Sequence, residues 1–420
     1  MRTVDLDAGI RQTTAPSGVT VLSERMPTVR SAAVGVWVRT ASAHEPRPKM
    51  GVSHLLEHMV FKGTERRTAR EIALALEAHG GSLDAYTSRD STAFHARVLD
   101  ADLPRAVDVL TDLVRRPTLR DSDLALERNV VLEEINTVQD TPDDLVFDLS
   151  AEALWPSHPY GYAILGTRET VTGLSRDDLQ GLHDRAYVPR NCAIAAAGNL
   201  EHEHLLALLA EHGWFDGAAP AGGPPPLAAA PPAVRGGEAR HERDTAQTHI
   251  VFGTDTVPFS DHRKYALMVL SNVFGGGMSS RLFQRIREEL GLAYAVYAFT
   301  SFHRGVGVSG VYVGTQPGTA RRAAEAIRDE FGKLAREGLQ GEALAEAKRQ
   351  TQGQLVLALE SPTARMYRLA GVAVYDEPFR SVDRVLAAIE ALTADEVGAV
   401  AAEFFAPERQ TVTWLGPNGG

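Results

Sequence analysis

The sequence is short of the residues that mark several classes of protein. Of its 420 residues only Cys192 is a cysteine, so no disulfide forms within the chain and a reducing compartment fits best. The first residues lack the apolar segment of a signal peptide. The longest uncharged stretch near the middle, residues 217–234, contains six prolines and three glycines, which rules out a membrane helix there. We therefore expect a cytoplasmic protein without a membrane partner.

Positive charge is also scarce relative to negative charge. The chain has 43 basic and 54 acidic residues, a formal net charge of -11. Because nucleic-acid affinity comes mostly from Lys and Arg on phosphates, we expect no nucleic-acid partner. What the chain does have is 44% apolar and 23% charged residues, the usage of a globular protein, and a length that fits roughly two to four domains.

A segment rich in proline, glycine and alanine divides the chain. It covers residues 217–240 and predicts a linker between an N-terminal domain, 1–216, and a C-terminal domain, 241–420. Residue patterns predict strands at 31–40, 83–88 and 92–99, and helices at 50–61, 68–79, 102–115, 121–139 and 143–154. Strands followed by several helices indicate the α+β class.

The second half resembles the first faintly. A shift of 218 residues places Gly35 on Gly253, and residues 53–58 on 271–276, with few identities. In this repeat, residues 271–276 lack the two histidines and the glutamate of residues 53–58, so the second copy has lost the side chains that could bind a metal. We predict two related halves, each a mainly antiparallel sheet with helices packed on one face.

The segment from Ser53 to Phe61 carries the chemistry. On a helix His54, Glu57 and His58 lie on one face, and the other positions are apolar, so the helix is expected to be buried. Two histidines one turn apart suit zinc, and the glutamate suits a base that activates water. The alternative is a pair of structural histidines in a satisfied core, because short strings of this kind also occur by chance.

A third ligand is expected from the helix at 121–139. Glu127 and Glu134 lie two turns apart on its apolar face with Val130, Val131 and Val138, whereas Glu133 points about 120° away and is expected to be solvated. A carboxylate on an apolar face is costly unless paired or metal-bound. We predict Glu134 as the third ligand and Glu127 as an acceptor that orients a histidine. The alternative is that both glutamates lie at an interface with a partner or pair with Arg128 or another basic residue.

Several further motifs are spread along nearly the whole chain. They are His54-Leu55-Leu56-Glu57-His58 with Phe61-Lys62-Gly63-Thr64, Glu127 to Ile135, His158-Pro159-Tyr160-Gly161, Gly166-Thr167, Asn199-Leu200, Gly275 to Phe283 and Gly291-Leu292-Ala293-Tyr294. Together they resemble those of the pitrilysin, insulinase and mitochondrial processing peptidase family, and the chain looks like a short bacterial member.

The resemblance implies one zinc ion per chain, held by His54, His58 and Glu134, with Glu57 as general base. It also implies a peptide-binding edge strand containing Asp84, Ala85 and Thr87, in which Asp84 replaces a usual asparagine. Arg287 and Tyr294 match residues that complete the active site from the opposite half or subunit; without the resemblance, Arg287 is better explained as a surface arginine paired with a glutamate. Because both sets occur in one chain, we expect a homodimer, with a heterodimer as the alternative.

Two functions are therefore weighed. The first is a zinc metalloendopeptidase that acts on peptides or unfolded segments. The second is a non-catalytic scaffold or partner subunit, which has no reason to keep polar groups on two buried helix faces. Residues 305–310 match G-x-G-x-x-G but lie in a strand-like run, and we interpret them as a glycine-rich strand rather than a nucleotide site.

Overall fold

The computed structural model describes residues 1–217 and 231–417, which form two compact units. The first unit contains residues 1–135, the segment from 163 to the gap, and 358–379; the second contains 136–162, the segment from the gap to 357, and the residues from 380 on. The predicted division into 1–216 and 241–420 therefore misses two exchanged segments. Each packs on a sheet built by the other half of the sequence.

The predicted linker, 217–240, lies only partly within the described structure. Residues 218–230 are outside the described residues. The last residues of the predicted linker belong to strand β8 (Gly237–Glu242), which pairs in parallel with β12 (Thr411–Gly416). The C-terminal end of the segment is therefore part of a sheet.

The first unit contains a seven-stranded sheet in the order β1-β2-β3-β7-β4-β6-β5. Only β3 and β7 are parallel neighbours. Within the part of the chain that the structure describes, strand β5 pairs only with β6 and so forms one edge of the sheet. The strands are β1 (Arg2–Asp7), β2 (Ile10–Thr14), β3 (Thr20–Arg25), β4 (Ser31–Val38), β5 (Ser82–Thr87), β6 (Thr92–Leu99) and β7 (Cys192–Gly198).

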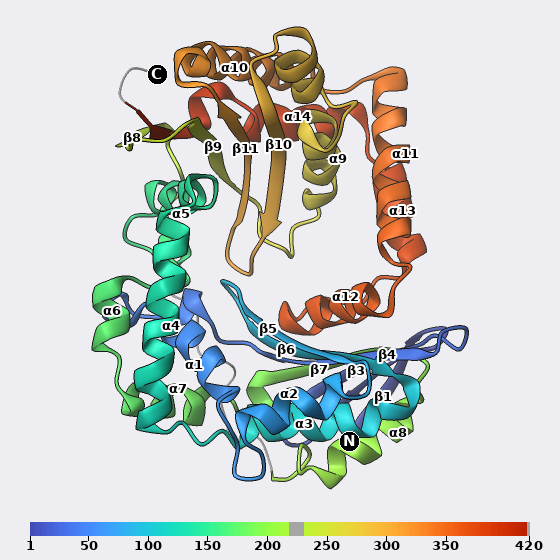
Figure 1. Cartoon of the computed structure of the whole chain (residues 1–420). Coiled ribbons are helices and arrows are strands. Elements are labelled where there is room, and N and C mark those ends of the chain that lie inside the picture. Colours follow the sequence, from blue (N-terminus) through green and yellow to red (C-terminus); the bar gives the residue numbers. More distant parts are fainter. Residues whose placement is uncertain (218–230, 418–420) are drawn as a thin grey trace. The chain divides into compact units, whose positions relative to one another are not determined.

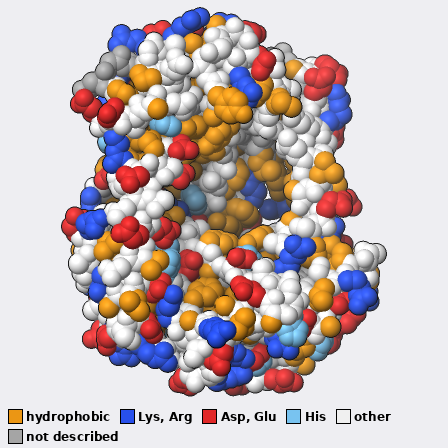
Figure 2. All heavy atoms as spheres, viewed as in Figure 1, with side chains coloured by type: hydrophobic (Ala, Val, Ile, Leu, Met, Phe, Trp, Pro, Cys, Tyr) orange, Lys and Arg blue, Asp and Glu red, His pale blue; other side chains and the backbone are white. Residues whose placement is uncertain are grey.

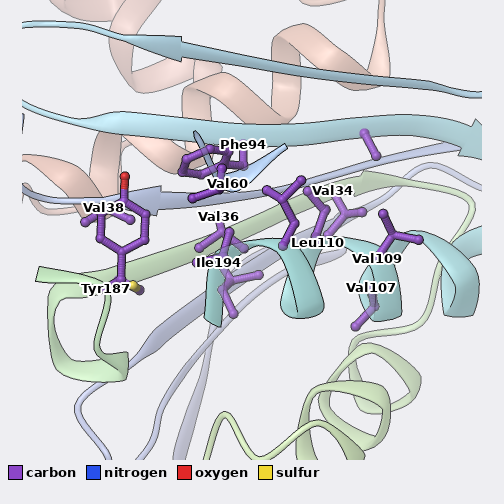
Figure 3. Packing of buried hydrophobic residues seen from close by; sticks show 14 of the residues in the cluster. Val34, Val36, Val38, Val60, Phe94, Val107, Val109, Leu110, Tyr187 and Ile194 are labelled. Carbon is purple, nitrogen blue, oxygen red and sulfur yellow. The ribbon is translucent and has the colours of Figure 1, made fainter. Parts of the chain in front are cut away.

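One face of this sheet packs on helices from the N-terminal half. Alternate residues of β4, namely Val34, Val36 and Val38, belong to one buried cluster with Leu110 of α3 and Val60 of α1; Val34 lies near Leu110 and Val38 near Tyr187 (Figure 3). Period-two apolar patterning on β4 thus meets an amphipathic helix. The helices of this half are α1 (Val52–Val60), α2 (Ala69–Glu77), α3 (Leu103–Arg115), α4 (Asp121–Gln139), α5 (Pro142–Leu154), α6 (Arg168–Gly173), α7 (Arg176–Ala186) and α8 (His202–Glu211).

The opposite face of the same sheet is covered by α12 (Pro362–Val374), a helix from the C-terminal half. Figure 1 shows α12 on one side of the strands and α2 and α3 on the other. Trp37 and three alanines of β7, at positions 193, 195 and 197, pack there against Met366 and Leu369. The prediction of helices on one face therefore describes only part of the arrangement, because both faces of these strands are apolar.

The second unit contains a five-stranded sheet in the order β10-β11-β9-β12-β8. This order matches β5-β6-β4-β7-β3, and Gly35 and Gly253 both lie in the central strand, as the repeat predicted. Residues 307–310 belong to β11, which agrees with a glycine-rich strand. Helix α5 covers the face opposite to α9 and α10. The remaining elements are β9 (Thr248–Thr256), β10 (Ala293–Phe302), β11 (Gly307–Thr315), α9 (Lys264–Gly275), the π-helical turn η6 (Phe283–Glu289), α10 (Ala320–Glu337), α11 (Gly341–Ala358), α13 (Val382–Glu390) and α14 (Ala394–Phe404).

The α+β class with two mainly antiparallel sheets is confirmed. Among the described residues, no helix is both long enough and apolar enough to cross a membrane. Acidic and basic side chains are interspersed over the face in Figure 2.

Candidate metal centre

Helix α1 begins at a position that only glycine fits well. Gly51 precedes the helix with φ of 86°, and a Cβ added there would lie 2.5 Å from the carbonyl oxygen of Leu165. Glycine has no side chain to cap the helix. The buried carboxylate of Glu45 does so instead, accepting hydrogen bonds from the backbone N–H groups of Gly51 and Ser53 at 2.8 Å each. The loop before α1 thus fixes the first turn of the helix.

Three side chains converge between α1 and α4. The Nε2 atoms of His54 and His58 each lie 3.6 Å from Oε2 of Glu134. Among the described residues, only these three bring one ligand atom each within 4.8 Å of one another. His54 is buried, and the other two are half-buried, so the cluster remains accessible from one side.

The second ring nitrogen of His58, which points away from Glu134, contacts another carboxylate. Its Nδ1 lies 3.3 Å from Oε2 of Glu127, a buried carboxylate, and the other oxygen of Glu127 lies 2.6 Å from Nζ of Lys62. A carboxylate on the far nitrogen fixes the tautomer and ring orientation of a ligating histidine. Glu127 therefore contacts His58 where a carboxylate could orient the ring, and that role stays a prediction.

Glu57 lies on the same helix but bonds to a strand. Its Oε2 accepts a hydrogen bond of 2.5 Å from Oγ1 of Thr87, at the end of edge strand β5. Burial raises the pKa of Glu57, and the bond from Thr87 acts in the opposite direction. The carboxylate is therefore oriented by one donor and kept a stronger base than an exposed glutamate.

The protonation states of His54 and Glu134 suit a cation-binding cluster, whereas a cation would have to displace a proton that the raised pKa of His58 favours. Burial, together with neighbouring His58, lowers the pKa of His54 to about 4. For His58, burial acts downward, but the bonds with Glu134 and Glu127 outweigh it and raise the pKa. The bond with His58 lowers the pKa of Glu134. At neutral pH His54 is therefore neutral and Glu134 ionised, which are the forms that coordinate metals.

The burial of side chains on α4 agrees only in part with the apolar face predicted from the helical wheel. Glu127 and Val131 are buried and Glu133 is exposed, as predicted. Val130, however, is 48% exposed, because the buried stripe of α4 is narrower than the wheel implied. Val138 is itself part of the second unit and packs there against the cluster that contains Val146 and Val251.

The predicted substrate residues lie on edge strand β5. Ala85 and Thr87 face the core with Leu83, whereas Asp84 is exposed on the opposite face, as the alternating burial of the strand shows. The hydroxyl of Thr87 is engaged with Glu57. Peptide binding by this strand stays a prediction.

Arg287 and Tyr294 belong to the second unit and lie next to each other. The guanidinium carbon of Arg287 lies 4.6 Å from the ring centre of Tyr294 and 4.7 Å from that of Phe283. Its Nε also lies 3.7 Å from a carboxylate oxygen of Glu288, the surface pairing considered as the alternative. Tyr294 is 79% exposed. Their catalytic role stays a prediction.

Two residues of the centre were missed from the sequence. Lys62 is four residues after His58, a spacing that was a usable signal, although α1 ends at Val60 and Lys62 lies in the turn that follows. Glu45 caps α1 from a short turn, and no spacing rule links a carboxylate six residues away to a helix start.

Comparison with known proteins agrees with this geometry. Residues 20–168 match the family described as "Insulinase (Peptidase family M16)", and residues 173–351 match "Peptidase M16 inactive domain". A protein of Streptomyces coelicolor named "uncharacterized zinc protease" is 37% identical over 413 residues, 97% of this chain and 90% of that protein. One of the same description from Bacillus subtilis is 36% identical over 411 residues, 98% of this chain and 99% of that protein.

Solved structures share the fold. A protease from Helicobacter pylori superposes with a TM-score of 0.92 at 22% identity, covering 97% of this chain and 99% of that chain. A structure titled as a peptidase M16 inactive domain from Pseudomonas fluorescens gives a TM-score of 0.90 at 20% identity, covering 98% and 99%. The resemblance inferred from the sequence motifs is confirmed: this chain belongs to the M16 family of peptidases.

Proposed function

We propose that this chain is a zinc-dependent endopeptidase that hydrolyses peptides or unfolded protein segments, with one zinc per chain. The convergence of His54, His58 and Glu134, with Glu57 on the same helix, is the observation that carries the proposal. Zinc protease names among relatives support the same metal.

The residues present fit a zinc ion. Two imidazole nitrogens and a carboxylate oxygen are a donor set found in catalytic zinc sites, where a fourth position stays open. Two ligand atoms bound at about 2.1 Å to a tetrahedral ion lie roughly 3.4 Å apart. The separations of 3.6 Å between Glu134 and each histidine are close to that value.

Residues of this chain would act together with the bound zinc. Bound there, zinc would supply Lewis-acid polarisation and an acidified water. Glu57 would accept the proton of the attacking water and return it to the leaving amine, a task that suits a carboxylate with a raised pKa. Thr87 would hold Glu57 in place through its hydroxyl.

Peptide would bind by adding to edge strand β5 at Asp84 and Ala85, because main-chain pairing needs only an open edge. Arg287 and Tyr294 would donate hydrogen bonds to the oxyanion, from the same chain or from a second copy in a homodimer. Sedimentation with activity measured against dilution tests the shared site: full activity of an isolated monomer would contradict it.

Replacement of Glu57 and Glu134 provides the central experiment. Glu57→Gln should abolish cleavage of a peptide library while the purified protein keeps about one zinc, since the ligands are intact. Glu134→Gln should lose the zinc as well. The adjacent exposed Glu133→Gln is the matched control and should behave as wild type. Retained cleavage by Glu57→Gln would remove Glu57 from the mechanism.

The alternative is a non-catalytic scaffold or partner subunit. It predicts a wild-type protein that neither retains zinc nor cleaves any peptide in the library. The same metal analysis and digest, repeated with a chelator, therefore separate the two functions.

A further inference from the structure

The edge strand β5 is tied to helix α12 by a chain of hydrogen bonds on the face of the sheet opposite the metal-binding helix. The hydroxyl of Tyr367, on α12, lies 2.6 Å from Nε2 of His95. Nδ1 of His95 lies 3.1 Å from the carbonyl oxygen of Asp84, its partner across the ladder. The chain therefore runs from α12 through β6 to the backbone of β5.

The direction of each bond follows from the groups involved. A carbonyl oxygen only accepts, so Nδ1 of His95 must carry a proton. Burial lowers the pKa of His95, which favours the neutral ring, and a neutral ring that is protonated at Nδ1 accepts at Nε2. Burial raises the pKa of Tyr367 to about 12, so its hydroxyl keeps the proton that it donates. His95 is thus held in the Nδ1–H tautomer.

The bond also orients the backbone of β5. The Ser88 N–H donates to the Ser91 carbonyl across the turn, so bonded pairs alternate along the ladder and the carbonyl of Asp84 faces His95 of β6, whose ring adds a second bond. Backbone groups of successive residues point to opposite sides of a strand, so those of Ala85 face the open edge. Tyr86 is anchored on the same face: its hydroxyl accepts from Nε1 of Trp37 at 3.1 Å.

We propose that Tyr367 and His95 are positioning residues for peptide binding: they hold the carbonyl of Asp84 toward β6 and so present Ala85 to an added peptide strand. The proposal rests on the proposed function, since it assumes that β5 receives the peptide. It adds that α12, from the second half of the sequence, sets the affinity of a strand in the first unit.

The tautomer is tested by nitrogen NMR of protein labelled at histidine, with His95→Asn used to assign the signal. Wild type should show His95 protonated at Nδ1. Tyr367→Phe should shift the ring toward the Nε2–H form, because its Nε2 loses the donor that fixed it. An Nε2–H ring in wild type would overturn the inference.

Binding is measured by fluorescence anisotropy of an extended peptide on the Glu57→Gln parent. Tyr367→Phe should weaken binding about 3- to 10-fold, the range of one hydrogen bond, with zinc content unchanged. In a His95→Asn background it should have no further effect, because the Asn amide can reach the Asp84 carbonyl without Tyr367. Tyr187→Phe, which removes a buried hydroxyl on the opposite face, is the control.

An unchanged affinity in Tyr367→Phe, a loss equal to that in Tyr187→Phe, or a parent that binds no peptide would each overturn the inference. A wild-type chain that binds the peptide but cleaves none would overturn the proposed function alone.

Discussion

A fragment ending at residue 216 should not fold by itself, because its sheet would lose the helix that covers one face. Helix α12 packs on β3, β4 and β7. Without it, Trp37 and the alanine-rich surface of β7 would be exposed to water. The predicted domain boundary would thus yield an incomplete domain.

The size of the effect follows from the burial of α12. Met366, Leu369 and Val374 are 0%, 0% and 3% exposed. Burying such a side chain contributes about 1.5–3 kcal/mol, so these three alone supply on the order of 5–9 kcal/mol. The whole net stability of a typical domain is about 5–15 kcal/mol. Loss of α12 is therefore comparable to the loss of all stability.

The assay compares the fragment with and without α12. Near-ultraviolet circular dichroism and urea unfolding of residues 1–216 should show no fixed tertiary structure. A synthetic peptide of residues 358–379, added in excess, should restore a cooperative transition by binding only the folded form. The same peptide with Leu369→Asp is the control and should have no effect. A fragment that unfolds cooperatively by itself, with no response to the peptide, would refute the reasoning.

Three further predictions concern the metal centre. Thr87→Val should raise the pKa of Glu57, because the bond from Thr87 opposes the effect of burial. Glu57 would then be protonated at higher pH. The acid limb of a profile of kcat/KM against pH should therefore move to higher pH, with zinc content unchanged. Glu127→Gln should weaken zinc binding about 10- to 100-fold in chelator competition, because it disturbs the acceptor for Nδ1 of His58; unchanged affinity would deny Glu127 an orienting role. Glu45→Ala should destabilise the metal-free protein by about 0.5–2 kcal/mol in thermal unfolding through loss of the α1 cap, and a stability equal to wild type would show that the cap is dispensable.

Local patterns predicted the elements of the first half well. The expected helices at 121–139 and 143–154 correspond to α4, Asp121–Gln139, and α5, Pro142–Leu154. The centre was equally accessible, because His54, His58 and Glu134 lie on helices whose periodicity fixes which side chains share a face. Where the periodicity was weak, as at Val130, burial was predicted incorrectly.

The packing of α5 and α12 on the sheet of the other half could not be predicted from the sequence, for a physical reason. Strand β7 is a continuous apolar run from Cys192 to Ala197, which indicates that both faces are covered. Such a run does not say which helix covers the second face. The partner, α12, lies more than 160 residues later in the chain. Hydrogen bonds that depend on this packing, such as that of Tyr367 with His95, were equally inaccessible.

The segment that contains α12 gives the second half of the sequence a structural role, although that half has no metal ligands among its described residues. Its sheet repeats the order of five of the seven strands of the first, yet no described residues there form a group like His54, His58 and Glu134. Its contribution to the first unit is instead α12, which covers the sheet that carries the edge strand. A substitution confined to α12 can therefore alter β5 without touching any residue of the metal centre. Binding should accordingly vary among α12 variants while metal content stays constant, whereas substitution of the ligands His54 or His58 on α1 should remove the metal.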